Sequence, residues 1–462
     1  MKRFVFLILI SVGAVACSSQ WKSLYDADEP REVNRIAEKP SVGQGDAARG
    51  LDYLTTGDYV GSGFPWSFAR KDSVRIDTVF MREGKNALIS WQNIAFTAPN
   101  GETVVSGSCF SCHASAQMGQ VTLGLGDSYS DFTSLKPWQA PLFKRIVKKN
   151  ASEAEWETAE NYVNWLAHSF AWIRTDQIGL NSAFRLEEAF AAHRDPVTLA
   201  YSKQEVFPNQ GPNVACDVPP LWNVKKKNAL YYNGMGRGDF TKLLMQAGMM
   251  GIADTVAARE IQQRFVDVVA WLEALEPPAY PGKIDVALSQ KGELVFEENC
   301  QKCHGSYGAF PEYPNKIIPL WKIQTDPVYA QYFMEESGLP AWFNKSWFGQ
   351  TAPVAQLLPS NGYIAPPLDG VWATAPYLHN GSVPNIATLL NSKLRPAIWT
   401  RSGSTDNYDL EQIGYPYQEG KERTSPYTYD TSKPGQSNSG HYFGDELTDE
   451  DRIAVLEYLK TL

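Results

Sequence analysis

The segment Cys109-Phe110-Ser111-Cys112-His113 decides how the rest of the chain is interpreted. Two cysteines at this spacing can each form a thioether with a haem vinyl group, and the following histidine can reach the iron from the same side. The pattern returns as Cys300-Gln301-Lys302-Cys303-His304. One Cys-x-x-Cys pair is also typical of redox dithiols and zinc sites. Two copies, each with the adjacent histidine, predict two covalently bound c-type haems with His113 and His304 as iron ligands.

The first residues predict export from the cytoplasm. Lys2-Arg3 is followed by an apolar run from Phe4 to Ile10, and small residues precede Cys17. A basic start and a short apolar run predict a signal peptide over residues 1–16 rather than a membrane span. The position of Cys17 resembles a bacterial lipobox, so we expect it to be lipidated, with ordinary signal peptidase cleavage as the alternative. Both predict the bacterial cell envelope, with a lipid-anchored protein that is periplasmic or outer-membrane-associated.

Length and charge restrict the remaining possibilities. The chain has 462 residues, enough for two or three domains, and a net charge of -9. It has no basic patch large enough to suggest nucleic-acid binding, whereas an acidic surface suits a small basic redox partner. Of six cysteines, Cys17 and the two motifs leave only Cys216. We interpret Cys216 as a structural thiol near a turn rather than a reactive one.

The first part of the chain is predicted to be one haem domain. Residues 17–50 are polar without a clear period and predict a tether from the lipid to the body. Residues 51–275 are predicted to form the domain itself, with a small β-containing N-terminal part. In this part, residues 96–105 form a hairpin that turns at Asn100-Gly101. Helical patterns follow over residues 153–172, 186–193 and 256–275.

A linker and a second haem domain follow. Residues 276–285 begin with a Pro- and Gly-rich run that predicts the linker, and residues 286–462 form the second domain. Gly292, Phe296 and Cys300 recur every four residues, so they share one face of a helix that leads to the second motif. A closing helix is expected over 447–462. The predicted fold is mainly α, with two cytochrome c-like haem domains, long loop insertions and a weak internal repeat.

The second axial ligand of each iron decides between electron transfer and chemistry, because an open position can bind O₂ or peroxide. After His304 the chain contains one methionine, Met334, and two histidines, His379 and His441. A Met/His pair is therefore scarcely available to the second haem. We expect a bis-His site there, with His441 favoured over His379.

The first haem has fewer candidate ligands. The remaining histidines are His168, within a helical apolar pattern, and His193, at an expected helix end. A histidine at a helix C-terminus is favourable there without any metal. The haem at His113 is therefore expected to keep an open or weakly held position and is the candidate reactive centre.

A family resemblance adds to this interpretation. With two haem motifs followed by Thr374-Ala375-Pro376-Tyr377-Leu378-His379-Asn380-Gly381-Ser382, most of residues 90–462 resembles the bacterial di-haem cytochrome c peroxidase superfamily. The chain departs from the peroxidases because no methionine follows Met334 to ligate the second haem. The stretch Asp217–Trp222 with Lys225–Lys227, and Gly440-His441 before the last helix, are similar to the rubber-oxygenase branch.

The resemblance implies roles for particular residues. His441 would be the distal ligand of the second haem, and the first haem would bind O₂ or peroxide. Trp222 matches the family's tryptophan between the haems and is the candidate catalytic side chain. A buried core aromatic after a Pro-Pro turn is the alternative for Trp222.

Together these patterns predict an exported di-haem c-type cytochrome oxidoreductase. The leading hypothesis is a peroxidase-like enzyme that reduces peroxide at the first haem with electrons that pass through the second. Its partners would be a small redox protein, peroxide or O₂, and the membrane through the N-terminal lipid only. The alternatives are oxygenase-type cleavage of an apolar substrate, as in rubber oxygenases, and a non-catalytic electron-transfer cytochrome.

Overall fold

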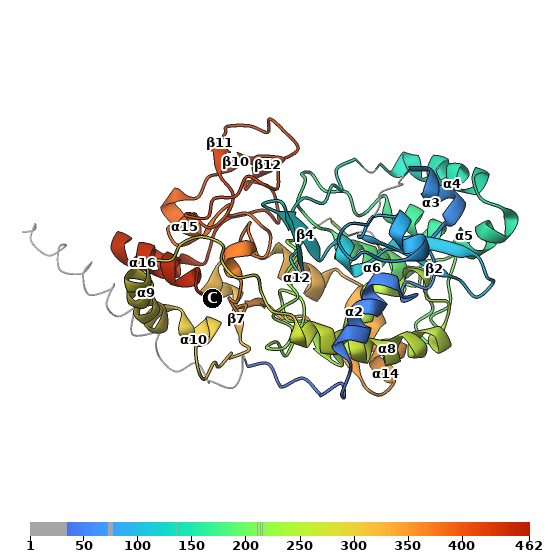
Figure 1. The fold of residues 1–462 in the computed structure, drawn as a ribbon, viewed down its shortest axis with the longest axis horizontal. Helices are drawn as coiled ribbons and strands as arrows, with labels where there is room; N and C mark the ends of the chain where they lie inside the picture. Colours follow the sequence, from blue (N-terminus) through green and yellow to red (C-terminus); the bar gives the residue numbers. More distant parts are fainter. Residues whose placement is uncertain (1–34, 73–76, 135, 210, 213, 215) are drawn as a thin grey trace, which may run out of the picture.

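The structure is a computed structural model that describes residues 35–462 except 73–76, 135, 210, 213 and 215 (Figure 1). The predicted signal peptide and Cys17 lie outside the described residues. The described chain is mainly helical with several small sheets of two or three strands, as the sequence predicts. No helix among the described residues is long and apolar enough to cross a membrane.

A small antiparallel sheet precedes the first motif. Its strands, in the order β1-β3-β2, are β1 (Phe64–Pro65), β2 (Asn93–Thr97) and β3 (Thr103–Gly107). Strands β2 and β3 form the predicted hairpin, which turns at Gly101 with a φ of +88°. This left-handed conformation favours glycine. Helix α3 (Trp66–Asp72) and the 3-10 helix η1 (Gly84–Leu88) flank the sheet.

The helices of the first half include those that the sequence predicts. They are α4 (Ala140–Lys149), α5 (Glu153–Ser169), α6 (Ala183–Ala192), α7 (Phe240–Met245) and α8 (Thr255–Ala274), with 3-10 helices η3 (Pro137–Gln139) and η4 (Gln246–Gly251). A capping box begins α5, where the Ser152 side chain accepts from the Glu155 N–H and the Glu155 side chain reaches back to the Ser152 backbone. The expected helices at 153–172, 186–193 and 256–275 are thus confirmed with small shifts at their ends.

Helix α2 (Ala47–Thr56) occupies a region where the sequence predicts the end of a tether and then short alternating runs. Its N-cap is Asp46, whose side chain accepts from two backbone N–H groups. Its Tyr53 ring packs edge-on against Phe265 of α8, with 6.2 Å between centroids. A Cβ added at Gly50 would lie 2.1 Å from the carbonyl oxygen of Asp267, so the two backbones nearly touch. The α2 and α8 helices lie side by side in Figure 1.

Residues 35–50 also differ from the expected free tether. Ile36 is buried, and its N–H donates to the carbonyl of Asn315 over 2.8 Å. Lys39 pairs with Glu273 at 3.1 Å. The partners of these residues lie more than two hundred positions away in the chain. A local pattern of polar residues cannot reveal such partners, so the sequence suggested only a tether.

The second half is built from short helices and strand pairs. The helices are α9 (Val286–Asn299), α10 (Gln301–His304), α11 (Leu320–Ile323), α12 (Val328–Glu335), α13 (Leu339–Lys345), α14 (Trp347–Gln350), α15 (Ile386–Leu389) and α16 (Asp449–Leu459), with the 3-10 helices η5 (Val371–Ala373), η6 (Ser392–Leu394) and η7 (Tyr442–Gly444). Its strands are β7 (Ile317–Pro319) paired with β9 (Gly362–Ile364), and the sheet β11-β10-β12 (Tyr417–Glu419, Ile398–Arg401, Thr428–Asp430). Strand β8 (Ala355–Leu357) pairs with β6 (Gly236–Gly238) of the first half, where β4 (Ala114–Gln117) also pairs with β5 (Gln120–Leu123).

Helices α9 and α16 bracket the second haem motif. A Cβ added at Gly292 of α9 would lie 1.9 Å from the carbonyl oxygen of Ala454 in α16, so these helices cross at the glycine. Phe296, one turn later, packs against Tyr458 with 5.2 Å between ring centroids. Thr448 is the N-cap of α16 and accepts from the N–H of Asp451. The helical face and the closing helix that the sequence predicts are therefore confirmed.

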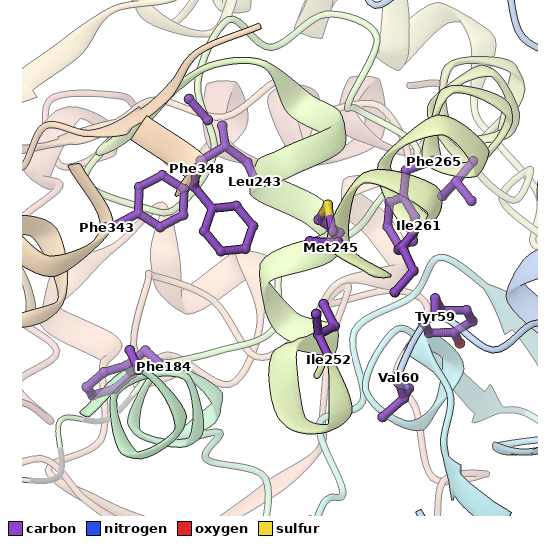
Figure 2. Packing of buried hydrophobic residues seen from close by; sticks show 14 of the residues in the cluster. Tyr59, Val60, Phe184, Leu243, Met245, Ile252, Ile261, Phe265, Phe343 and Phe348 are labelled. Atoms are coloured by element: carbon purple, nitrogen blue, oxygen red, sulfur yellow. The ribbon is translucent and has the colours of Figure 1, made fainter. Parts of the chain in front are cut away.

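The two halves of the sequence exchange segments in the hydrophobic cores. The larger core contains side chains of the first half together with residues from 329 to 363, and Phe343 and Phe348 lie near Leu243 of α7 (Figure 2). Conversely, Leu125 and Trp222 belong to the core of the second half. The predicted division at residues 276–285 is therefore crossed by packing in both directions.

Candidate haem-binding sites

The first motif is a tight turn that is anchored by the burial of its own phenylalanine, Phe110. The 3-10 helix η2 (Cys109–Ser111) follows β3 directly, and Ser108 caps it by accepting from the Phe110 N–H at 3.2 Å. Phe110 is fully buried against Trp271 of α8, with 5.6 Å between ring centroids. The Cys109 N–H donates to the hydroxyl of Tyr59 over 3.0 Å. Burial raises the pKa of the Cys109 thiol to about 11.

The second motif adopts the same local hydrogen bonding at the end of a helix. The His304 N–H donates to the carbonyl of Cys300 at 3.1 Å, and the His113 N–H donates to the carbonyl of Cys109 at 3.0 Å. In both motifs the backbone therefore folds the histidine back over the first cysteine. The two motifs therefore share this backbone hydrogen bond, which is consistent with the same attachment chemistry at each.

A proline carbonyl orients the histidine of the second motif, and the surroundings of the first motif histidine differ. The Nδ1–H of His304 donates to the carbonyl of Pro366 over 2.8 Å, which leaves the Nε2 lone pair available to a metal. Burial lowers the pKa of His113 to about 4, against a smaller opposing effect of the Pro219 carbonyl, and the Nδ1 of His113 is buried without a hydrogen-bond partner. His113 is therefore neutral, the form in which imidazole ligates iron.

These two prolines begin the same short sequence. Residues 219–221 and 366–368 both read Pro-Pro-Leu. The sequence interpretation used the first of these segments and missed the second. The repetition of Pro-Pro-Leu after each haem motif is the signal that would have identified Pro366.

His441 faces His304 at a spacing that suits one metal atom between them. The ring centroids are 6.1 Å apart and the ring planes meet at 56°. Two metal–imidazole bonds of about 2.0 Å, with ~1.1 Å from each nitrogen to its ring centre, give a separation of ~6 Å. Burial first, and then the neighbouring His304, lower the pKa of His441 to about 3, so this ring is also neutral. The residues present therefore fit a haem iron with histidine on both sides.

His379, the other candidate that the sequence leaves open, lies elsewhere. Its buried ring stacks on Tyr363 with 4.0 Å between centroids and 18° between planes. Tyr232 and Tyr329 complete the surrounding aromatic cluster. Its Nε2 is buried without a hydrogen-bond partner, and burial lowers its pKa to about 3. The structure thus brings His441, and not His379, against His304.

The two remaining histidines stack on each other instead of facing His113. The rings of His168 and His193 are 4.0 Å apart and nearly parallel. The Nδ1 of His193 also bonds the carbonyl of Ser202 at 3.1 Å. Among the described residues, no other imidazole ring makes a ring contact with His113. The first motif histidine is therefore unlike His304, which has a histidine opposite it.

Trp222 lies between the two proline segments. Its Nε1–H donates to the carbonyl of Asp369 over 2.8 Å, and Asp369 follows Pro366 by three residues, just as Trp222 follows Pro219. A Cβ added at Gly370 would lie 3.1 Å from the indole, and one added at Gly124 would lie 3.4 Å from it on the first-motif side. The Gly124 N–H in turn donates to the carbonyl of His113 at 2.8 Å.

Cys216 lies close to the first motif. Its Sγ donates to the backbone carbonyl of Asn181 at 2.9 Å. Burial raises the pKa of this thiol far above its ordinary value, with the neighbouring Asp217 acting in the same direction. A thiol in this state is a poor nucleophile.

Comparison with known proteins gives a partial match. Residues 362–400 match a family described as RoxA-like, cytochrome c-like, and this segment includes Pro366 and His379. Two uncharacterised proteins of Sinorhizobium fredii (strain NBRC 101917 / NGR234) are similar: y4iJ is 33% identical over 253 residues, and y4iM is 29% identical over 254 residues. These alignments cover 41% and 49% of this chain and 41% and 56% of the two relatives, so the chain spans about half the length of the curated relatives it matches. The description of the matched segment as cytochrome c-like is consistent with the two Cys-x-x-Cys-His motifs.

Proposed function

We propose that this protein is an exported di-haem c-type cytochrome oxidoreductase whose chemistry takes place at the first haem. One haem would be attached to Cys109 and Cys112, and the other to Cys300 and Cys303. The observation that carries the proposal is the asymmetry of the two motif histidines: His304 has His441 at 6.1 Å, whereas His113 has no imidazole opposite it among the described residues. An iron with a single protein ligand keeps a position for a substrate.

The chain's own residues would hold and orient these groups. His113 and His304 would be the proximal ligands, and the carbonyl of Pro366 orients the ring of His304. When bound, the haems supply one-electron redox chemistry and, at an open axial position, a binding site for peroxide or O₂. Trp222 connects the two proline segments through its bond to Asp369, and so lies on a short route between the two groups.

Peroxide reduction is the reaction that we favour. Hydrogen peroxide, two protons and two electrons give two water molecules, and the electrons would come from a small redox protein. The net charge of -9 favours a basic donor. Lipidation at Cys17 would hold the protein at the periplasmic or outer-membrane face of a bacterial envelope.

Oxygenase-type cleavage of an apolar substrate is the second candidate, and the RoxA-like match over residues 362–400 favours it. The two reactions differ in what they consume. A peroxidase consumes one peroxide for every two electrons that the reduced donor supplies. An oxygenase consumes O₂ and forms carbonyl products without a protein donor.

The proposal is tested by EPR and optical spectra of the purified ferric holoprotein, with and without cyanide and peroxide. We expect one low-spin signal that ignores the additions and one haem that is high-spin or exchanges its ligand. His441→Ala should abolish the first signal, and His379→Ala, the matched control, should preserve it. Two low-spin haems that remain indifferent to added ligands, before and after one-electron reduction, would contradict an enzyme and favour an electron carrier.

A further inference from the structure

The guanidinium of Arg395 connects two segments that meet beside His441. All five of its N–H donors point at backbone carbonyls. The acceptors and distances are Thr388 (3.3 Å), Leu389 (2.9 Å), Asn438 (2.7 Å), Gly440 (2.7 Å) and His441 (3.2 Å). The first two carbonyls are at the end of α15, and the other three belong to the loop that carries His441.

This loop has no regular structure that could fix it. His441 and Gly440 both have positive φ, 49° and 81°, a conformation that costs energy in a non-glycine residue. A Cβ added at Gly440 would lie 2.2 Å from the backbone nitrogen of Thr325, so this side of the loop lies directly against the chain. The N–H of His441 donates to the carbonyl of Ile323 at 2.7 Å. Arg395 therefore holds the loop from one side and residues 323–325 hold it from the other.

The guanidinium of Arg395 donates to backbone carbonyls rather than to a carboxylate. Among the described residues, no carboxylate forms a salt bridge with it. Asp445 is the carboxylate that acts electrostatically on Arg395, but it accepts two hydrogen bonds from Ser392 instead, at 2.8 and 2.6 Å. Hydrogen bonds from a charged donor are about twice as strong as neutral ones. Five such bonds in one planar group fix both the position and the direction of the chain that they join.

We propose that Arg395 is the positioning residue that holds His441 opposite His304 and thereby fixes the coordination of the second iron. The inference rests on the proposed function, because it takes His441 to be an iron ligand. Arg395 does not touch the iron; it acts through the backbone of residues 438–441. Besides these bonds from Arg395, the loop is held by the bond from His441 to Ile323 and by the Asn438 side chain, which donates to the carbonyl of Pro396. Further along the loop, Ser437 bonds Asp326, Asn380 and Ser382.

The test is Arg395→Lys in the holoprotein, because lysine keeps the charge but has only three donors on a flexible stem. We expect part of the low-spin EPR signal of the second haem to become high-spin. We also expect cyanide to displace His441 from the second haem about tenfold faster. This factor corresponds to the loss of roughly one hydrogen bond from a charged group. Added imidazole should restore the low-spin signal. Arg423→Lys is the matched control, since the exposed Arg423 bonds a single carbonyl, that of Ser425, at 3.3 Å.

Further variants separate the possible failures. If His441→Ala leaves the low-spin signal intact, the ligand assignment in the proposed function is wrong and the inference falls with it. If His441→Ala abolishes the signal while Arg395→Lys behaves as wild type, only the inference is overturned. In the double variant, Arg395→Lys should add nothing to the effect of His441→Ala on the spectrum. Arg395→Gln, checked by circular dichroism, replaces the lysine variant if that one does not fold, and a wild-type signal in it overturns the inference.

Discussion

Glu187 is a buried carboxyl group whose ionisation opposes folding. It lies on α6 and accepts from the Gln246 Nε2 at 2.7 Å and from the Tyr231 hydroxyl at 3.2 Å. Burial raises its pKa to about 7 from an ordinary value of 4.5, and the two hydrogen bonds only partly offset this rise. The folded state therefore binds the proton more tightly than the unfolded state. As pH rises from 4.5 through 7, the protein loses stability.

We expect Glu187→Gln to remove this pH dependence, because glutamine is neutral and its amide oxygen can still accept from Gln246. Below pH 4.5 the charge no longer distinguishes the two proteins. Above pH 7 the variant should be the more stable by up to about 3 kcal/mol. Urea unfolding at pH 4.5, 6 and 8 measures this difference. Glu153→Gln, at an exposed position of α5, should retain the wild-type pH profile; an identical profile for Glu187→Gln would contradict the burial argument.

The sequence could identify residues whose chemistry is local and not those that depend on tertiary placement. The proposed ligands His113 and His304 could be named from the sequence because the haem-attachment motif is specified within five residues. The choice between His441 and His379 was not settled by the sequence, because ring separation from His304 is a property of the fold. Arg395 gave no signal, since its five acceptors are backbone carbonyls, and three of them belong to residues 438–441, far along the chain.

At the scale of elements, the crossing of α9 and α16 depends on one glycine. The Cβ that alanine would add at Gly292 would meet the carbonyl oxygen of Ala454 at 1.9 Å, and this atom belongs to the backbone. The helices must then move apart. We expect Gly292→Ala to lower the free energy of unfolding by about 1–3 kcal/mol, the usual cost of overpacking.

Denaturant unfolding followed by tryptophan fluorescence measures this loss, and the low-spin signal of the second haem shows whether the helix shift reaches His304. Leu294→Ala is the control on the same helix, because Leu294 is 68% exposed. It should change stability by less than about 0.5 kcal/mol. Equal stability of Gly292→Ala and wild type would mean that the two helices are not in close contact.

Elements with a strong period were predictable, and those held by distant partners were not. Helices α5, α8 and α16 were predicted from their helical sequence patterns, and the structure adds a side-chain cap at the start of each. Helix α2 was missed because it has only ten residues and its apolar side is completed by α8. Its formation depends on burial against another helix rather than on its own propensity.

At the scale of the whole molecule, the two sequence halves are not two independent bodies. Residues from 329 to 363 complete the first core, and Leu125 and Trp222 contribute to the second. The sequence predicts a boundary at residues 276–285 because prolines there interrupt regular secondary structure. It could not predict the exchange of segments, because core membership follows from tertiary packing and not from composition.

Trp222 belongs to the second core and bonds the carbonyl of Asp369, so its replacement tests the proposed route between the two motifs. In Trp222→Phe the ring remains, but the hydrogen bond to Asp369 is lost and the new ring is harder to oxidise. We expect the spectra of both haems to be unchanged. Donor-dependent peroxide turnover should fall by about tenfold, equivalent to ~1.4 kcal/mol in the barrier. Trp399→Phe is the matched control, because Trp399 is also buried and its Nε1–H donates to the backbone carbonyl of Ser382 at 3.0 Å. If both variants turn over peroxide at the wild-type rate, electrons do not pass by way of Trp222, and this tryptophan serves only to pack the two halves together.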